Sequence, residues 1–396
     1  MRRRIFICNE YNFEAGRVIV ALNKNCIYPN IPTCYDDSIF DGIEAERIEV
    51  IFHPQNLTDD SEIGAIILIY LKCKEKQTVL EVIEELLRNP CVVCAEPDHF
   101  IDTHIIPNDS YFRYLWGMEK IKSPSAWNYT TGSYSVVVGV IDSGIDYNHP
   151  DIINNLWIAL DQQDNSAEIN GSAMDETGHG THIAGTIGAV GNNFIGVTGV
   201  CWNVRMASLK IGNVNFNLAA AIRAIDYANE NNIQILNNSW GERFTSSSLK
   251  FAIDHYNGIF IASAGNSGTN NDIYPVYPAS YNSSNIISVA ATDPNGNLAF
   301  FSNYGRRSVD IAAPGAYILS TNLYGGYSHM SGTSMAAPHV AGAVALLKGY
   351  RPDLTILEMK DIILSSVDRQ PDLFGKVLTE GTLNIHKMIE RAVIRP

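Results

Sequence analysis

Residues 331–349 read SGTSMAAPHVAGAVALLKG, and the rest of the chain is interpreted around them. From Met335 onward the residues are almost all small and apolar, which predicts a helix buried on all sides with other backbones packed close to it. Pro338 is expected in the first turn, where the backbone N–H groups have no intrahelical partner. Ser334 then lies at the positive end of the helix, where negative charge is stabilised. A hydroxyl at this position is often only a helix cap, so other motifs must decide its role.

Length and composition limit the possible classes of protein. A chain of 396 residues predicts two units, one of them large. Charged residues make up 18% and hydrophobic residues 46%, which is typical of globular proteins. The net charge of −14 argues against a nucleic-acid partner and is compatible with cation binding. No apolar run is long enough to cross a bilayer, and the apolar part after Met1 is too short to be recognised as a secretory signal.

The seven cysteines are unevenly distributed. Only Cys201 follows residue 100, and the spacings of the others are irregular. This pattern favours free thiols in a reducing compartment over disulfides or a metal site, while the compartment itself is left open. The other six are Cys8, Cys26, Cys34, Cys73, Cys91 and Cys94.

The first 100 residues predict a small α+β unit. Residues 16–22, 65–71 and 91–95 are typical of strands. Residues 78–87 carry apolar side chains at helical spacing and predict an amphipathic helix. Residues 101–111 have no periodicity and are interpreted as a connector.

Beyond the connector, apolar strands alternate with helices. Continuous apolar runs predict strands covered on both faces, and the alternation predicts a parallel sheet with helices on each side. Ligand chemistry in such folds gathers at the carboxyl ends of the strands. The expected strands are 135–141, 205–209, 233–236, 258–262 and 286–290, and the expected helices are 179–188, 218–230 with Asn217 as cap, and 247–256.

Four polar residues stand where these elements begin or end. Asp142 follows the strand 135–141, His179 opens a helix of small residues, Asn266 follows the strand 258–262, and Ser334 opens the helix described above. Taken singly, each has an ordinary explanation as a turn or core residue. His179 with His182 could suggest zinc, but no glutamate follows the first histidine as zinc proteases require. Together, the residues place an acid, an imidazole, an amide and a hydroxyl at one edge of the sheet.

Five motifs carry a resemblance to the subtilisin-like serine proteases, the subtilases. The order acid, histidine, serine is that of subtilisin, whereas α/β-hydrolases have the order serine, acid, histidine. The resemblance runs from about residue 16 to residue 385. It implies an α/β fold of three layers around a doubly wound, mostly parallel sheet, and a small ferredoxin-like propeptide domain. The motifs are VIDSGI (140–145), HGTHIAG (179–185), NNSWG (237–241), AGN (264–266) and GTSMA (332–336).

The resemblance implies a role for each of these residues. Ser334 is expected to be the nucleophile, His179 the general base and then acid, and Asp142 the group that orients the imidazole. The Asn266 amide and the Ser334 N–H are expected to form the oxyanion hole. The histidines at 182 and 339 lie deeper in their helices and are expected in the core.

The resemblance also implies a binding site for extended polypeptide. Ser239, Trp240 and Gly241 are expected to form the edge strand that pairs with substrate. Val276 stands where the family often has glycine, at the floor of the pocket for the residue before the scissile bond, so a shallow pocket is expected. Residues 210–216 are shorter than usual and lack the glycine-rich strand opposite Ser239.

A structural calcium site follows in the same way. Two carboxylates, an amide and backbone carbonyls make the hard oxygen cage that calcium prefers. The alternative is a polar loop capped by surface acids. The expected ligands are Asp109, Asp151, Val190, Asn192, Ile195 and Val197.

A self-processing zymogen is the expected form of the protein. Residues 1–104 are expected to be the propeptide with its linker, bound in the cleft of a catalytic domain at 105–396. The cut is expected within 100–108, between His104 and Ile105, with Ile101 in an outer apolar subsite. A monomer that acts on polypeptides, with no nucleic-acid or membrane partner, is expected. The alternative is a catalytically silent member that keeps its propeptide and only binds peptides.

Overall fold

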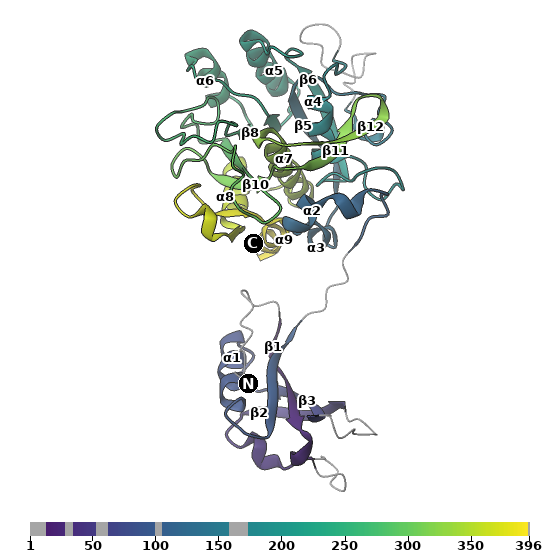
Figure 1. Cartoon of the computed structure of the whole chain (residues 1–396), viewed down its shortest axis with the longest axis vertical. Coiled ribbons are helices and arrows are strands. Elements are labelled where there is room, and N and C mark those ends of the chain that lie inside the picture. Colours follow the sequence, from purple (N-terminus) through teal and green to yellow (C-terminus); the bar gives the residue numbers. More distant parts are fainter. Residues whose placement is uncertain (1–12, 28–34, 53–61, 100–104, 158–172, 395–396) are drawn as a thin grey trace. The chain divides into compact units, whose positions relative to one another are not determined.

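The chain divides into two compact units. The computed structural model describes residues 13–27, 35–52, 62–99, 105–157 and 173–394 (Figure 1). Contacts between residues separate Met1–Asp102 from Thr103–Pro396, and each unit is described by itself. This division lies next to the boundary predicted after residue 104.

The N-terminal unit is an antiparallel sheet with a helix on one face. The strand order β2-β3-β1-β4 is that of a ferredoxin-like fold. Between β1 and β2 the described residues form two short 3-10 helices, η1 and η2, and no α-helix. Helix α1 buries Val79, Ile83 and Leu86 because their spacing places them on one face. The bounds are β1 Phe13–Asn23, η1 Lys24–Cys26, η2 Asp37–Phe40, β2 Ala45–Phe52, β3 Ile63–Leu71, α1 Lys76–Leu86 and β4 Val92–His99.

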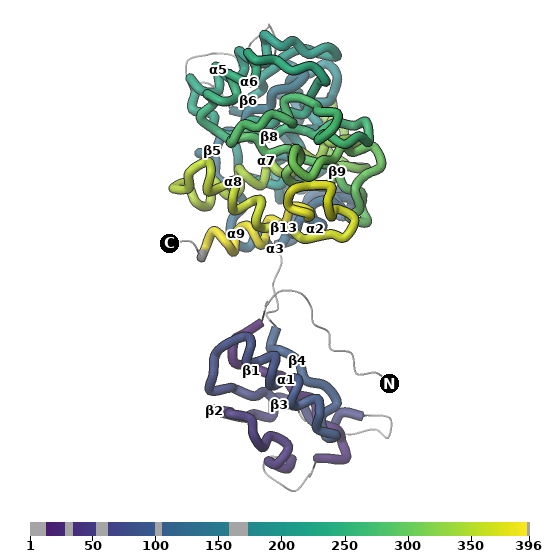
Figure 2. Tube along the Cα trace, turned by 90° about the vertical axis from the view of Figure 1, so that its left-hand side faces the viewer, coloured from purple at the N-terminus to yellow at the C-terminus, as the bar shows by residue number. Residues whose placement is uncertain are grey.

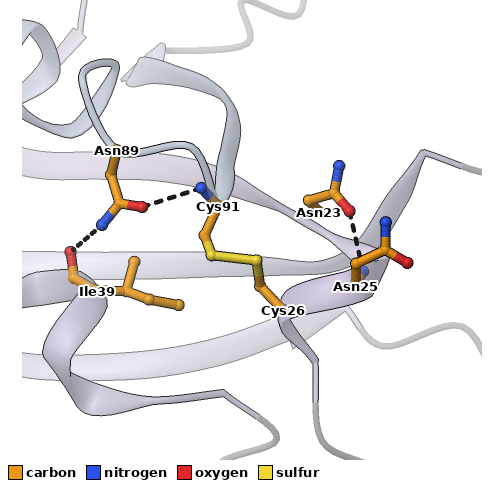
Figure 3. The surroundings of a disulfide bond; sticks show 6 residues. All are labelled: Asn23, Asn25, Cys26, Ile39, Asn89 and Cys91. Atoms are coloured by element: carbon orange, nitrogen blue, oxygen red, sulfur yellow. Dashed lines mark hydrogen bonds between the residues drawn. A yellow bond between two sulfur atoms is a disulfide. The ribbon is translucent and has the colours of Figure 1, made fainter.

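A disulfide links Cys26 to Cys91, with 5.8 Å between their Cα atoms (Figure 3). The prediction of free thiols is therefore wrong for these two residues. They are 65 residues apart in sequence, but β1 and β4 pair side by side, and the Asn23 N–H donates to the Cys91 carbonyl at 2.8 Å. Disulfides persist in oxidising surroundings, so the cysteines of this chain no longer favour a reducing compartment.

The remaining cysteines divide into three groups. Cys73 and Cys94 are exposed free thiols, and Cys201 is a buried one. Cys8 and Cys34 lie outside the described residues. The free-thiol prediction thus holds for the three described cysteines outside the disulfide.

The second unit is built on an eight-stranded sheet of order β13-β14-β10-β9-β8-β7-β5-β6. All neighbouring strands are parallel except β13 and β14. This confirms the predicted α/β class with a mostly parallel sheet. The strand bounds are β5 Gly132–Asp142, β6 Asn203–Lys210, β7 Ile235–Asn238, β8 Ile259–Ser263, β9 Ile286–Thr292, β10 Ile311–Pro314, β13 Val367–Arg369 and β14 Gly381–Leu383; β11 Ile318–Asn322 and β12 Gly326–Met330 form a separate hairpin.

Helices cover both faces of this sheet and bury two large apolar clusters. Helices α5 and α6 pack together, as do α8 and α9 (Figure 2). None of the helices in the described part of the chain is both long and apolar enough to span a membrane. The bounds are α2 Trp116–Lys120, α3 Ser123–Trp127, α4 His179–Gly188, α5 Leu218–Glu230, α6 Ser247–Asp254, α7 Thr333–Tyr350, α8 Ile356–Ser365 and α9 Ile385–Ile394; the 3-10 helices are η3 Phe112–Tyr114, η4 Ile153–Asn155, η5 Leu323–Gly325 and η6 Pro371–Leu373.

Helix α7 lies in the middle of the unit and packs on β5, β7, β8, β9 and β10 (Figure 1). Its small apolar residues are buried from Met335 to Leu347, as predicted. The prediction for Pro338 is wrong, because α7 begins at Thr333 and Pro338 falls in the second turn. Proline cannot donate to the carbonyl four residues earlier, which is that of Ser334. The Ser239 hydroxyl donates to this carbonyl at 2.8 Å instead, so the backbone group stays paired.

Candidate active site

Three element ends bring the acid, the imidazole and the hydroxyl to one edge of the sheet. Asp142 is the last residue of β5, His179 is the first of α4, and Ser334 is the second of α7. Gly180 has no room for a side chain, because a Cβ would collide with the Gly144 carbonyl. Helix α4 can therefore begin directly against the loop that follows β5.

The imidazole of His179 is paired with a fully buried carboxylate. His179 Nδ1 lies 2.7 Å from Asp142 Oδ1, and the Ser143 N–H donates to the same oxygen at 2.8 Å. Because a carboxylate only accepts, Nδ1 carries the proton and Nε2 of the neutral ring is free to accept one. Burial disfavours the charged ring, but the Asp142 carboxylate, with a smaller contribution from the charge of Asp175, outweighs burial and raises the pKa of His179 above its usual value.

Asp175 fixes the loop that leads into α4. Its Oδ1 accepts from the Ser143 hydroxyl and the Thr177 N–H, both at 2.9 Å. Its Oδ2 accepts from the Thr181 N–H at 2.9 Å and from the Thr181 hydroxyl at 2.7 Å. Burial works against the carboxylate, but these hydrogen bonds outweigh it and lower the pKa of Asp175. Sequence analysis missed this residue, although an aspartate four residues before His179 in a glycine-containing turn is a usable signal.

The Ser334 hydroxyl donates to the Ser239 carbonyl at 3.0 Å. Among the described residues its hydrogen bond goes to this carbonyl and not to His179. The Ser334 N–H belongs to the first turn of α7, where amide groups lack an intrahelical acceptor. The Ser334 hydroxyl must therefore leave the Ser239 carbonyl before it can donate to another acceptor.

The Asn266 amide is held with its oxygen on Thr333, the first residue of α7. Asn266 Oδ1 accepts from the Thr333 N–H at 2.8 Å and from the Thr333 hydroxyl at 2.9 Å. Because both groups donate, Oδ1 must face them, and Nδ2 is the atom left to donate elsewhere. A Cβ on Gly332 would lie 3.3 Å from Nδ2, so the amide nitrogen reaches the backbone beside Ser334.

The segment 239–241 follows β7 and has Val276 behind it. The Trp240 indole N–H donates to the Ile141 carbonyl at 3.1 Å, which anchors the segment on β5. A Cβ on Gly241 would lie 2.9 Å from one methyl of Val276, and a Cβ on Gly265 would lie 3.5 Å from the other. The buried Val276 side chain therefore fills space between the segments 239–241 and 264–266.

A pocket of about 220 Å³ lies next to Trp240 and Gly241. The segment 210–216, which the family resemblance marks as shorter than usual, contributes to the lining and contains a bridge between Gly212 and Phe216. Sequence analysis did not predict this pocket, because its walls come from three separate segments. Its apolar lining includes Ile211, Phe216, Ala221, Trp240, Leu249 and Tyr277.

Two buried carboxylates, Asp109 and Asp151, lie close together outside the residues described so far. Burial raises the pKa of Asp109, and burial together with the charge of Asp109 raises the pKa of Asp151 to about 6. Asp151 accepts from the Val197 N–H at 2.9 Å and from the Tyr327 hydroxyl at 3.1 Å. Among the described residues the buried Oδ1 of Asp109 has no hydrogen-bond donor.

The amide on Asp151 comes from Asn193, whose Nδ2 donates to Asp151 Oδ1 at 2.8 Å. The side-chain oxygen of Asn192 instead accepts from the Asn108 N–H at 3.3 Å, and its N–H donates to Asp109 at 2.7 Å. The structure thus brings Asn193 to Asp151, not the predicted Asn192. The assignment of Asn192 as a calcium ligand stays a prediction.

The donor set of this cluster fits a hard cation. Within the described residues no three His, Cys, Asp or Glu side chains gather as a metal site, and the cluster supplies only two carboxylates. The carbonyl oxygens of Val190, Ile195 and Val197 accept no hydrogen bond from another described residue. Two carboxylates close together with free carbonyls nearby are oxygen ligands of the kind that calcium takes.

Comparisons with known proteins identify the family. The model of the subtilase family matches residues 133–381, and the chain belongs to this family. It is 37% identical over 288 residues to a thermophilic serine proteinase of Bacillus sp. strain AK1, covering 70% of this chain and 69% of that protein. It is 38% identical over 290 residues to thermitase of Thermoactinomyces vulgaris, covering 72% and 99%.

A solved structure gives the same result. A protease from Pseudoalteromonas arctica PAMC 21717 superposes with a TM-score of 0.62 at 29% identity, covering 72% of this chain and 99% of that one. The predicted family and enzyme class are therefore confirmed: the protein is a subtilisin-like serine endopeptidase, and its substrates are polypeptides. Subtilases commonly bind calcium.

Proposed function

We propose that Ser334 is the nucleophile of this endopeptidase, that His179 is its base and then its acid, and that Asp142 orients the imidazole. The observation that carries the proposal is the hydrogen bond of 2.7 Å between His179 and the buried Asp142, at the same sheet edge as the start of α7. A neutral imidazole with the Nδ1 proton bound to a carboxylate leaves Nε2 ready to take the serine proton.

The proposed reaction begins when a polypeptide strand pairs with residues 239–241. The Ser334 hydroxyl leaves the Ser239 carbonyl, gives its proton to His179 Nε2, and attacks the substrate carbonyl carbon. The oxyanion that forms accepts from Asn266 Nδ2 and the Ser334 N–H, next to the positive end of α7. His179 then protonates the departing amine, and the breaking peptide bond leaves an acyl group on Ser334. Water, deprotonated by His179, releases the acyl group and regenerates the serine.

The pocket beside Trp240 is proposed to take an apolar side chain of the substrate, several residues before the scissile bond. Its volume of about 220 Å³ and its Phe216 and Leu249 walls suit an aliphatic or aromatic group. The space next to Val276 is proposed to take a small or mid-sized side chain before the scissile bond. These two subsites would set the preference of the enzyme.

The acidic cluster is proposed to hold one calcium ion. Asp109 and Asp151 would supply carboxylate oxygens, and backbone carbonyls would complete the shell. The Asn193 amide would hold the Asp151 carboxylate in place, since its Nδ2 donates to Asp151 and its Oδ1 accepts from the Ile195 N–H. The ion would neutralise two carboxylates whose raised pKa values reflect the cost of burying their charges. Its role would be structural.

The N-terminal unit is proposed to be an inhibitory propeptide that the enzyme removes by its own activity. The sheet face opposite α1 carries the half-buried apolar residues Ile19, Ile66 and Leu68, and such a face suits docking on a catalytic domain. The proposed cut lies within 100–108; residues 100–104, which include Ile101 and His104, lie outside the described residues. A monomer is proposed.

Self-cleavage gives the test of this proposal. Purified wild-type protein is expected to show a cut within 100–108 by intact-mass spectrometry, at a rate independent of protein concentration. The Ser334→Ala and His179→Ala variants should each remain one chain of 396 residues and should lose peptide hydrolysis. A cut Ser334→Ala chain would mean that another protease does the processing. A wild type that is neither cut nor active would favour a peptide-binding protein.

A further inference from the structure

The loop that carries Asn266 rests on two buried asparagines. Asn303 is fully buried and Asn271 is 2% exposed. Neither belongs to a helix or strand, and neither is part of the proposed triad or oxyanion hole. Buried side-chain amides are costly unless all their polar atoms are paired, so a buried pair requires an explanation.

Asn303 binds the backbone on both sides of Asn266. Its N–H donates to the Gly265 carbonyl at 2.8 Å, and its Oδ1 accepts from the Ser267 N–H at 2.9 Å. The same oxygen accepts from the Thr269 N–H at 3.2 Å. Asn303 thus fixes both neighbours of Asn266: Gly265 through its backbone N–H and Ser267 through its side-chain oxygen.

Asn271 completes the support and sets the orientation of both amides. Asn303 Nδ2 donates to Asn271 Oδ1 at 3.0 Å, and Asn271 Nδ2 donates to the Ala264 carbonyl at 2.8 Å. Because backbone N–H groups can only donate, Asn303 Oδ1 must face Ser267, which leaves its Nδ2 for Asn271. The hydrogen bonds therefore allow only one orientation of each amide. Together they hold the loop from Ala264 to Thr269 in one position.

Gly265 allows this close support. It has φ +106°, and a Cβ there would lie 2.5 Å from Asn303 Nδ2. Its N–H donates to the Thr333 hydroxyl at 3.0 Å, and that hydroxyl in turn donates to Asn266 Oδ1. The Asn266 amide is thus held through its own oxygen from the side of α7, and through its backbone from the side of Asn303.

We propose that Asn303, supported by Asn271, is a positioning residue that sets the location of the Asn266 amide in the oxyanion hole. The pair acts on the transition state only through Asn266, since in the described structure its side-chain hydrogen bonds reach neither the triad nor the segment 239–241. The inference rests on the proposed role of Asn266. Donors in an oxyanion hole act over short distances, so a small displacement of the amide lowers turnover.

A double-mutant cycle between Asn303 and Asn266 tests the inference. Asn266→Ala should lower kcat by about 10² to 10³. Asn303→Ala should lower kcat by about 10-fold while KM changes less. In the Asn266→Ala background, Asn303→Ala should change kcat less than about 2-fold, because the group that it positions is gone. All proteins are assayed as the full chain on one peptide substrate, at the same extent of processing.

Asn285 provides the matched control. It is also a buried asparagine, and its Nδ2 donates to the carbonyls of Ile253 at 2.8 Å and Tyr256 at 3.2 Å, before the start of β9. Asn285→Ala should lower the melting temperature but leave kcat unchanged in both backgrounds. If Asn303→Ala does not fold, Asn271→Ser is used in its place. It should lower kcat less than Asn303→Ala, and the loss should again disappear in the Asn266→Ala background.

The outcomes separate the inference from the proposed function. A wild-type kcat for Asn303→Ala, or an equal loss with and without Asn266, overturns the inference and leaves Asn266 in its role. An unchanged kcat for Asn266→Ala overturns the oxyanion hole itself, and the positioning role with it. Loss of kcat in Asn303→Ala that disappears in the Asn266→Ala background supports the inference.

Discussion

The two units hold their structures by different means. The N-terminal unit has a four-stranded sheet, one α-helix among its described residues, a small apolar cluster, and a disulfide between η1 and the residue before β4. The second unit has two large apolar clusters around an eight-stranded sheet, and its functional loops are fixed by buried polar networks. Small domains bury too little apolar surface to be very stable, so a covalent link matters more there. The comparison indicates that the smaller unit is the easier one to unfold.

Removal of the disulfide should therefore affect one unit alone. Cys26→Ser with Cys91→Ser opens a loop of 65 residues, and loop-closure entropy predicts a loss of about 4 kcal/mol in the stability of the N-terminal unit. Hydrogen exchange, measured unit by unit, should show faster exchange in β1 to β4 and no change in α7. If the double variant exchanged faster in both units, the disulfide would not be specific to the stability of the N-terminal unit. Cys201→Ser, which removes a buried free thiol, serves as the control for cysteine replacement.

Removal of calcium should destabilise the second unit and leave the N-terminal unit unchanged, the opposite of the disulfide variant. A ligand held by Asp109 and Asp151 stabilises only the second unit, by about 2.7 kcal/mol when its concentration is 100 times its dissociation constant. Chelation should then lower the melting temperature of that unit, and Asp151→Asn should remove most of the response. Asp293→Asn, which changes an aspartate outside the cluster, should respond like the wild type. An equal melting temperature with and without chelator, on protein shown to contain the metal, would exclude the site.

Much of the second unit follows from its sequence, because its signals are local. The bounds of α4 and α5 and the cap at Asn217 agree with prediction, since small residues and an asparagine before an apolar helix act over a few positions. The features that were not predicted depend on pairs of residues that are far apart in the sequence and in contact in the fold. The disulfide joins Cys26 to Cys91, and the amide pair joins Asn303 to Asn271, 32 residues apart. No periodicity connects such positions, so only the folded chain reveals them.

Val276 allows a test of the proposed substrate site. Because its methyl groups fill space between Gly241 and Gly265, Val276→Gly should raise kcat/KM for substrates with Phe before the scissile bond by about 10-fold relative to Ala substrates. Val276→Ile, which adds one methylene, should shift the preference in the other direction. Equal changes for Phe and Ala substrates in both variants would show that Val276 does not line this pocket.

The pH dependence of activity reports on the Asp142–His179 pair. The expected change, a rise in the midpoint of the acid limb of kcat/KM, is the smallest of those predicted here. The folded pKa of His179 is raised, so the proton is lost only above the usual value of about 6.5. Activity needs the neutral ring, and the acid limb of kcat/KM should therefore have its midpoint above 6.5. The same charged pair stabilises the fold below the unfolded pKa, and this contribution is lost as pH rises through the folded pKa. A midpoint below 6.5 would contradict the pairing.

Covalent labelling with a fluorophosphonate tests the central claim most directly. The probe reacts with a serine that is activated by a neighbouring base and loses fluoride as the phosphorus–oxygen bond forms. Mass spectrometry should find one adduct on Ser334 of the wild type. It should find none on Ser334→Ala, and a much slower reaction with His179→Ala. An unlabelled wild type with an open cleft, or a label on another serine, would contradict the assignment of the active site.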